Sequence, residues 1–322
     1  MLVLYRGIMR TNAKLLVLAL VVGLCCNAAE PKRPKITGIA HMAIFVSDVD
    51  KARTFYKDFL GYGEPFDLKT PTGDLSLTFI KINDRQYVEI FPENEKGSDR
   101  LNHISIETDD AEAMHSYLAS KGVKVPEKVN TNRIGNKSFS VKDPDGHGVE
   151  ITQYTPTGAS AREKGNFMGP NRISNRMAHF GILVGDLAAS QAFYHDILGF
   201  KEFWRGSSKD SKMLSWVNMQ VPDGDDYIEL MLYDVIPEPT KRGSAHHICL
   251  FVPDMDKAKA ELESRPAAKS YTKPLEIRTG INRKRQMNLF DPDGTRVELM
   301  EPVTIDGKAT PSSTAPPPVK TK

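Results

Sequence analysis

The 322-residue sequence predicts an α+β protein of four βαβββ modules, which form two domains with curved mixed sheets and helices on the outer face. The first observation is a duplication, since AHMAIFVSDVDKARTFYKDFLGY at 40–62 matches AHFGILVGDLAASQAFYHDILGF at 178–200. The second is a shorter repeat within each half, at 102–122 and 246–265, where a strand again precedes a helix. Such self-similarity identifies repeated structural units more firmly than residue propensities do.

Composition excludes several classes of protein. Lys and Arg (43) nearly balance Asp and Glu (41), which disfavours the strongly basic face that nucleic-acid binding requires. Hydrophobic residues make up 40% of the chain, and no internal apolar run approaches the roughly 18 residues of a membrane-spanning helix. We therefore expect a globular protein whose partner is a small-molecule substrate rather than a nucleic acid. The composition leaves open whether the protein forms a homodimer.

Residues 1–28 have the order of a secretory signal peptide. Three basic residues precede the apolar run 15–26, and small residues follow it up to Ala28. We expect cleavage after Ala28 and a secreted or periplasmic protein with no membrane attachment after cleavage. One alternative is acylation at Cys25 or Cys26, and the other is an uncleaved membrane anchor, which an apolar run of only about 12 residues disfavours.

The repeats set the domain boundaries. A segment rich in Gly, Pro, Ser and Asn separates the halves, and the C-terminal end is rich in Pro and Ser. Without the signal peptide only Cys249 remains, so the mature chain has no intrachain disulfide and depends on its core, its interfaces or a metal. The predicted organisation is a signal peptide at 1–28, a first domain at 37–155, a linker at 156–176, a second domain at 177–303 and a disordered tail at 304–322.

Each module begins with a strand and continues into an amphipathic helix that an Asp caps. Asp48 precedes the helix expected at 49–60, and Asp109 and Asp186 precede the matching helices. Short strands complete each module. Pairing modules one with two and three with four is the simplest arrangement, although one with four and two with three would also give two sites.

Strand alternation brings a His and a Glu of every module to one face of the sheet. Successive side chains of a strand point to opposite faces, so His41 lies opposite the apolar stripe that Met42 and Ile44 form. Each last strand holds a Glu between two apolar residues, which would pack under the helices and leave the Glu facing the cleft. His247 fits the alternation better than its neighbour His246. The eight resulting residues are His41, Glu89, His103, Glu150, His179, Glu229, His247 and Glu298.

These eight residues predict metal sites. Imidazole nitrogens and carboxylate oxygens are natural ligands for Zn, Ni, Co, Mn or Fe(II). Two carboxylates in an enclosed cleft cost several kcal/mol each unless a cation or water compensates their charge. Any single His or Glu is more often a partly solvated strand residue, but eight matching placements in four repeats indicate at least one divalent metal site.

The residues of 37–155 and 177–303 also carry a family resemblance. The strand AHMAIFV, the helix ends FYKDFLG and FYHDILG, and the DPDG turns at 143–146 and 291–294 before a final Val-Glu occur together. In these marks the chain resembles the glyoxalase/bleomycin-resistance/extradiol-dioxygenase superfamily, also called vicinal oxygen chelate proteins. The resemblance implies paired βαβββ units around a divalent metal that chelates neighbouring oxygens of a substrate.

The order His, Glu, His, Glu is similar to that of bacterial-type glyoxalase I. This resemblance implies a metal-dependent lyase, isomerase or epimerase in which the metal polarises a carbonyl and a carboxylate moves a proton between adjacent carbons. Glu150 and Glu298 are the candidate catalytic bases. Phe45 and Leu183 occupy the position at which that enzyme has an Arg for the glutathione carboxylate, so the resemblance does not extend to glutathione.

Two other functions stay open from the resemblance. Extradiol dioxygenases hold Fe(II) with two His and one Glu, which would correspond to His179, His247 and Glu298. They have a Tyr ten residues before that Glu, where this chain has Asn288, and they lack the additional carboxylate that Glu229 supplies. A bleomycin-resistance-like protein would bind and sequester a small molecule, but such proteins generally lack the metal ligands.

Loop residues before the penultimate strands are candidates for binding an anionic substrate. They are Arg133 and Asn136 in the first half and Arg283 in the second. Solvated surface charge is an equally good interpretation of these residues.

Overall fold

Each half of the chain folds into one eight-stranded sheet. The computed structural model describes residues 31–319, and the predicted signal peptide lies outside them. The first sheet contains β1 (Ile36–Val46), β2 (Asp67–Lys69), β3 (Leu75–Lys81), β4 (Tyr87–Pro92), β5 (Leu101–Thr108), β6 (Asn130–Thr131), β7 (Lys137–Lys142) and β8 (Gly148–Gln153). The second sheet contains β9 (Met177–Val184), β10 (Lys201–Gly206), β11 (Trp216–Gln220), β12 (Tyr227–Leu232), β13 (His247–Phe251), β14 (Ile277–Thr279), β15 (Lys284–Phe290) and β16 (Arg296–Thr304).

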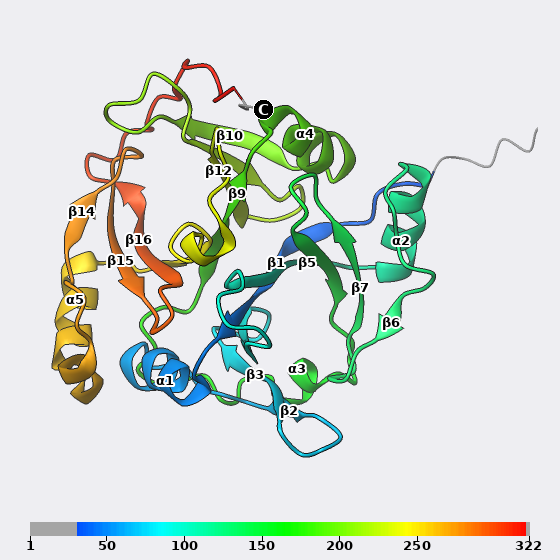
Figure 1. Cartoon of the computed structure of the whole chain (residues 1–322), viewed down its shortest axis with the longest axis horizontal. Coiled ribbons are helices and arrows are strands. Elements are labelled where there is room, and N and C mark those ends of the chain that lie inside the picture. Colours follow the sequence, from blue (N-terminus) through cyan, green and yellow to red (C-terminus); the bar gives the residue numbers. More distant parts are fainter. Residues whose placement is uncertain (1–30, 320–322) are drawn as a thin grey trace, which may run out of the picture. The chain divides into compact units, whose positions relative to one another are not determined.

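The order of the strands settles how the modules pair. The sheets have the orders β2-β3-β4-β1-β5-β8-β7-β6 and β10-β11-β12-β9-β13-β16-β15-β14. Figure 1 shows β1 beside β5 in the first half and β9 beside β12 in the second. The first strands of two modules are antiparallel neighbours at each centre, and each of them lies parallel to the last long strand of its own module. Modules one and two therefore share one sheet, and modules three and four share the other. The predicted α+β fold with two curved mixed sheets is confirmed.

The helices begin at the Asp residues that the sequence indicated, with one correction. The helix α2 is capped by Asp110, whose side chain accepts a hydrogen bond from the Ala113 amide, and not by Asp109. Asp109 instead accepts a hydrogen bond from the Lys35 amide at 2.9 Å. The helices are α1 (Val49–Arg53), α2 (Ala111–Ser120), α3 (Ala159–Arg162), α4 (Leu187–Gln191) and α5 (Met255–Ser264), with 3₁₀ turns at Pro239–Lys241 and Pro266–Ser270.

The two duplicated helices change to π-helical winding in their second half, at Thr54–Phe59 and Ala192–Ile197. A π-helical turn holds more residues than an α-helical turn, so adjacent side chains project at a smaller angle to each other. Phe55 and Tyr56 are accordingly both buried although they are adjacent in sequence. The FY pair of this motif thus packs into the core as a unit.

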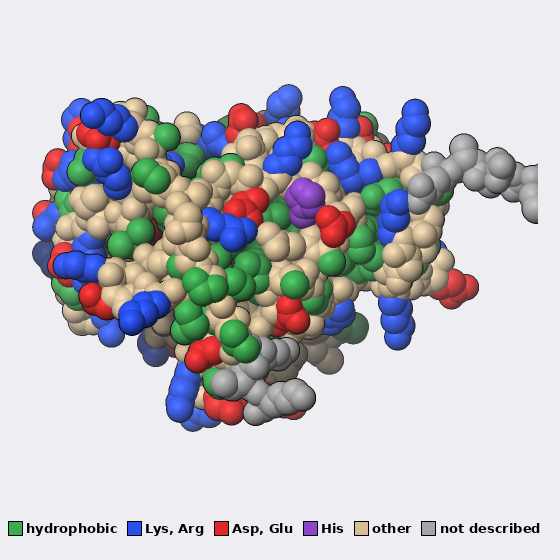
Figure 2. All heavy atoms as spheres, turned by 90° about the horizontal axis from the view of Figure 1, so that it is seen from above, with side chains coloured by type: hydrophobic (Ala, Val, Ile, Leu, Met, Phe, Trp, Pro, Cys, Tyr) green, Lys and Arg blue, Asp and Glu red, His purple; other side chains and the backbone are tan. Residues whose placement is uncertain are grey.

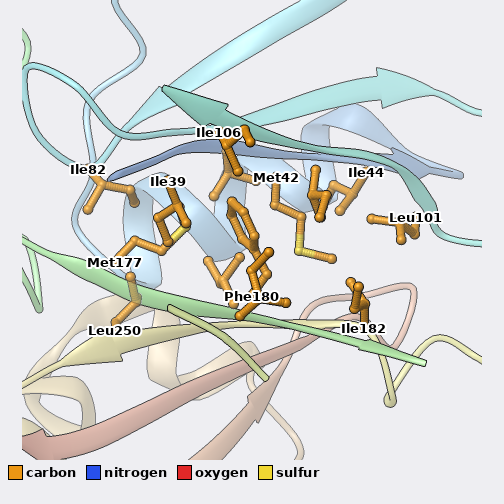
Figure 3. Packing of buried hydrophobic residues seen from close by; sticks show 14 of the residues in the cluster. Ile39, Met42, Ile44, Ile82, Leu101, Ile106, Met177, Phe180, Ile182 and Leu250 are labelled. Carbon is orange, nitrogen blue, oxygen red and sulfur yellow. The ribbon is translucent and has the colours of Figure 1, made fainter. Parts of the chain in front are cut away.

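The apolar faces of the two sheets pack against each other. Met42 and Ile44 of β1 face Phe180 and Ile182 of β9 across the core (Figure 3), and all four side chains are at most 1% exposed. They belong to one hydrophobic cluster that continues through both halves. The sequence predicted helices over the apolar residues that flank each Glu, but it did not predict that the apolar residues of these first strands are covered by the sheet of the other half. The two halves therefore share one core.

The family motifs meet at this interface in a reciprocal pattern. The Tyr56 hydroxyl of the first FY pair lies 3.4 Å from Asp291 of the second DPDG turn, and Tyr194 of the second pair donates to Asp143 of the first turn at 3.0 Å. The Ser47 amide likewise donates to Asp293 at 2.9 Å. Each DPDG turn leads into the strand that carries a predicted ligand, so each half helps to position the site of the other.

Asp291 gives this interface a pH dependence. Burial raises its pKa from 3.8 to about 7. Between these values the folded chain retains a proton that the unfolded chain has released, so stability falls as the pH rises through this window. We expect Asp291→Asn, which cannot ionise, to reduce that fall by about 2 to 3 kcal/mol between pH 5 and pH 8, because each pKa unit corresponds to about 1.4 kcal/mol.

Urea unfolding at pH 5 and pH 8 measures the effect, with the exposed Asp58→Asn as the matched control. An equal fall in stability for Asp291→Asn and wild type would contradict the assignment.

The linker and the tail are more structured than the sequence predicted. Within 156–176 the chain forms α3, and the buried Lys81 ammonium donates to the carbonyls of Glu163 at 2.5 Å and Asn166 at 2.9 Å. The tail was expected to be disordered. Its described part, up to residue 319, has no helix or strand after β16 but bonds to the second half, through Ser313 to the Arg205 carbonyl and through Pro316 to the Leu214 amide. These contacts join the tail to the edge of the second sheet.

The described surface carries charges of both signs. Lys and Arg side chains lie interspersed with Asp and Glu on the face seen in Figure 2. No helix formed by residues 31–319 has the length and apolar content needed to cross a lipid bilayer. Cys249, the one cysteine among residues 31–319, is buried.

Candidate functional site

The first cluster consists of His41, Glu89, His103 and Glu150, one residue from each of the four central strands of the first sheet. The Nε2 atoms of the two histidines are 3.0 Å apart. A Glu150 oxygen lies 2.9 Å from the His41 Nε2 and 3.2 Å from the His103 Nε2, and Glu89 lies 3.6 Å from His41. All four predicted side chains thus meet at one point on the sheet.

The second cluster consists of His179, Glu229, His247 and Glu298 on the equivalent strands. The histidine Nε2 atoms are 3.1 Å apart, and Glu298 lies 3.5 Å from His179 and 3.7 Å from His247. Glu229 lies 3.6 Å from His247. His246 points elsewhere, because its ring packs on His147 and its Nε2 lies 3.6 Å from Asp99.

Neighbouring groups orient two of the imidazoles. The Nδ1 of His247 lies 3.0 Å from the Ala245 carbonyl, and the Nδ1 of His103 lies 3.1 Å from the Asn102 side-chain oxygen. Each oxygen favours a proton on Nδ1, which leaves the Nε2 lone pair for a ligand. Both lone pairs then point toward the partner histidine and the carboxylates.

Burial makes it unfavourable to ionise both carboxyl groups of a cluster. Burial raises the pKa of Glu89 and of Glu229. Burial also acts on Glu150 and Glu298, but hydrogen bonds with the cluster histidines outweigh it and lower the pKa of each. In each cluster the carboxylate on the last strand is therefore ionised, while the other resists ionisation. A bound cation would compensate both.

The histidines of the two clusters behave differently. Burial lowers the pKa of His41, but Glu89 and Glu150 outweigh it and the pKa rises overall. Burial lowers the pKa of His247 well below its usual range, and the charge of Arg296 lowers it further. The positive charge of Arg296 thus acts on the second cluster, and the first cluster has a glycine at the equivalent position.

The donor atoms fit a divalent metal. Ligating atoms of His41, Glu89 and His103 lie within 4.8 Å of one another, and so do those of His179, His247 and Glu298. Metal–nitrogen bonds are about 2.1 Å, so two nitrogens at right angles around a metal would be about 3 Å apart, close to the separation of the histidine pairs. Two imidazoles with carboxylates suit Zn, Mn or Fe(II).

The three predicted substrate-binding residues have other partners. Arg133 is exposed and donates to the Lys69 carbonyl, and Arg283 forms an ion pair with Asp306 at 2.5 Å. Asn136 is buried, and its side-chain oxygen accepts a hydrogen bond from the Thr155 amide. The structure places none of the three among the residues of either cluster.

A cavity of about 70 Å³ adjoins the second cluster, and most of its lining was not predicted. Trp204 of β10 and Trp216 of β11 contribute two aromatic side chains to it. Besides ligands and tryptophans, the lining contains Ile281, Asn282, Gln286 and Arg296. Arg296 precedes Glu298 by two residues, so strand alternation places it on the same face, and this signal was available in the sequence.

The corresponding wall beside the first cluster is more apolar. Phe79 pairs with Glu89 across the strands, where Asn218 pairs with Glu229 in the second sheet. The rings of Phe66, Phe79 and Tyr87 pack together there. The clusters share their ligand types but not their surroundings.

Paired βαβββ modules around His and Glu clusters define a class of tandem-domain, metal-site proteins, and comparison with known proteins agrees. The family model "Glyoxalase/Bleomycin resistance protein/Dioxygenase superfamily" matches residues 38–151 and 176–299. The chain belongs to this superfamily, and the family resemblance is confirmed.

Individual relatives include enzymes. The lactoylglutathione lyase of Schizosaccharomyces pombe is 24% identical over 310 residues, which cover 81% of this chain and 95% of that protein. The Mn(II)-bound glyoxalase of Novosphingobium aromaticivorans is similar in fold, with a TM-score of 0.64, 17% identity and coverage of 88% of this chain and 86% of that one. The 2,3-dioxygenase LapB of Pseudomonas sp. KL28 gives a TM-score of 0.63, 16% identity and coverage of 84% and 93%. The expected divalent metal agrees with the Mn(II) of the Novosphingobium glyoxalase and with the ligand groups of this chain.

Proposed function

We propose that the protein is a metal-dependent lyase, isomerase or epimerase that moves a proton between adjacent carbons of a small oxygen-rich substrate. One observation carries the proposal: in the first cluster the ionised carboxylate of Glu150 lies within 3.2 Å of both histidine nitrogens. A carboxylate that shares a site with metal ligands lies beside a substrate bound there. The lactoylglutathione lyase of Schizosaccharomyces pombe, which matches most of the chain, supports this reaction class.

Different residues of each cluster would bind the metal and transfer the proton. His41, His103 and Glu89 would hold the cation in the first cluster, and His179, His247 and Glu229 in the second. A bound divalent cation would act as a Lewis acid on a substrate carbonyl. An oxygen of Glu150 or Glu298 accepts the proton from the neighbouring carbon and returns it to the adjacent one.

A second candidate is an extradiol-type ring-cleaving dioxygenase that uses Fe(II). The observation in its favour is that His179, His247 and Glu298 form a triad of two histidines and one carboxylate with mutually close donor atoms. Asn288 lies opposite Glu298 on the adjacent strand and supplies no phenol hydroxyl.

Metal analysis combined with two assays tests the proposal. We expect one or two equivalents of divalent metal per purified chain, and metal-dependent conversion of the hemithioacetal of methylglyoxal and 2-mercaptoethanol to its thioester. Chelation followed by metal return should abolish and restore that conversion.

Oxygen uptake with catechol as substrate distinguishes the candidates. Uptake without thioester formation would replace the proposal by the dioxygenase. A metal-free protein that still binds its ligand in full would indicate a sequestering protein instead.

A further inference from the structure

Each sheet has a row of three residues paired across neighbouring strands, with the second histidine of its cluster in the middle. The two rows differ in the residue on the last strand. In the first sheet the row through the second histidine contains Ala43, His103 and Gly148. In the second sheet the equivalent row contains Gly181, His247 and Arg296. A glycine of the first cluster therefore corresponds to an arginine in the second.

The second sheet is built to accept this arginine. A Cβ atom at Gly181 would overlap the imidazole ring of His247, which occupies the space above that glycine. In the first sheet the close approach is on the other side, where a Cβ at Gly148 would lie 2.9 Å from the His103 Cβ. The glycine of the row thus lies on β8 in the first sheet and on β9 in the second. The His247 ring occupies the space above the β9 glycine, which leaves room for Arg296 on β16.

The guanidinium of Arg296 has no carboxylate partner. Its Nη2 lies 2.6 Å from the His247 Nδ1, 3.2 Å from the His247 Nε2 and 3.6 Å from the Met231 sulfur. Among residues 31–319 no carboxylate lies within ion-pair distance of it, and its buried Nε has no hydrogen-bond partner. The Nδ1 of His247 already faces the Ala245 carbonyl, so the contact with the ring is a poor substitute for an anion.

A second donor beside the same cavity is also unpartnered. The indole N–H of Trp204 is buried without a hydrogen-bond partner, and Trp204 is only 9% exposed. Arg296 and Trp204 both line the cavity together with Glu229 and Glu298. Buried donors without partners are rare in folded proteins, and here two of them surround one cavity.

The two clusters also differ in their charge once a metal is bound. Two carboxylates balance one divalent cation, so a metal-loaded first cluster has no net charge when its imidazoles are neutral. Arg296 adds one positive unit to the charge of the metal-loaded second cluster, and Lys284 also interacts electrostatically with Glu298 there. A buried positive site binds an anion that compensates it better than an uncharged ligand of the same shape.

We propose that Arg296 is a specificity-determining residue that makes the second cluster bind a small carboxylate with an oxygen on the neighbouring carbon, whereas the first cluster binds an uncharged vicinal-oxygen compound. The proposal rests on the proposed function, because it requires a divalent metal in each cluster. When the Nε2 of His247 is ligated, the guanidinium leaves the ring and faces the cavity, where the ligand carboxylate accepts its hydrogen bonds.

Calorimetry with two isosteric probes tests the inference. Glycolate and hydroxyacetone have the same shape but differ by one negative charge. They are titrated into Mn(II)-loaded His41→Ala/His103→Ala, which keeps the second cluster, and into Mn(II)-loaded His179→Ala/His247→Ala, which keeps the first. We expect the protein with the second cluster to bind glycolate at least about tenfold more tightly than hydroxyacetone, the size of a charge-assisted hydrogen bond. The protein with the first cluster should show no such preference.

Arg296→Met and Arg296→Lys identify the residue responsible. In the protein that keeps the second cluster, Arg296→Met should remove the glycolate preference while the Mn(II) content stays the same, and Arg296→Lys should retain part of it. A preference that survives Arg296→Met overturns the inference.

A transplant keeps the test decisive if Arg296→Met does not fold. Ala43→Gly together with Gly148→Arg recreates the row of the second sheet in the first. This pair should give the protein with the first cluster a preference for glycolate, and no gain would overturn the inference. Mn(II) that binds to neither protein would show failure of the proposed function, whereas bound Mn(II) without a charge preference would show failure of this inference alone.

Discussion

Replacing Glu150 and Glu298 together by glutamine should lower turnover by about 10³-fold or more, within the range that general acid–base groups contribute. Glutamine preserves the shape of the side chain, but its amide oxygen cannot carry a proton between two carbons. Each single variant should remove only the contribution of its own cluster. Thioester formation from the methylglyoxal hemithioacetal measures the loss.

Metal content separates proton transfer from metal binding in this experiment. If the glutamine variants keep their metal and lose turnover, the carboxylates act on the proton. The exposed Glu263→Gln on α5 is the matched control and should behave like wild type. A double variant that retains more than about a tenth of the turnover would rule out both glutamates as bases.

Phe180→Ala should destabilise the whole chain by about 3 to 5 kcal/mol, the usual range for a deleted core aromatic. The Phe180 side chain is fully buried, and Figure 3 shows it between β1 and β9, where both sheets pack. Its loss leaves a cavity at the junction of the two halves. Urea unfolding followed by fluorescence measures the change.

The matched control is Phe203→Ala, because Phe203 is 51% exposed on β10. Its loss should cost less than about 1 kcal/mol, since little apolar surface is buried there. If Phe180→Ala cost no more than Phe203→Ala, the two halves would not share one core. Two separate unfolding transitions in the wild type would lead to the same conclusion.

Much of the candidate site follows from strand alternation. The period of two placed His41 and Glu89 on the same face, and the repeats extended the pattern to the other three modules. The structure brings these eight side chains together in two groups of four. Alternation is a local property of extended backbone, so it can be read without knowledge of the fold. Arg296 obeys the same rule, although only the strand pairing in the structure showed that it lies beside His247.

Sequence alone therefore determined the repeated module, the His and Glu residues that form the two clusters, and the family. Tertiary structure alone decided which modules share a sheet, and it gave the FY pairs and DPDG turns a reciprocal contact between the halves. It also paired Arg133 with the Lys69 carbonyl and Arg283 with Asp306, and it joined the tail to the second sheet. The physical reason is the range of the interactions: periodicity and capping act within a few residues, whereas these contacts join residues far apart in the chain.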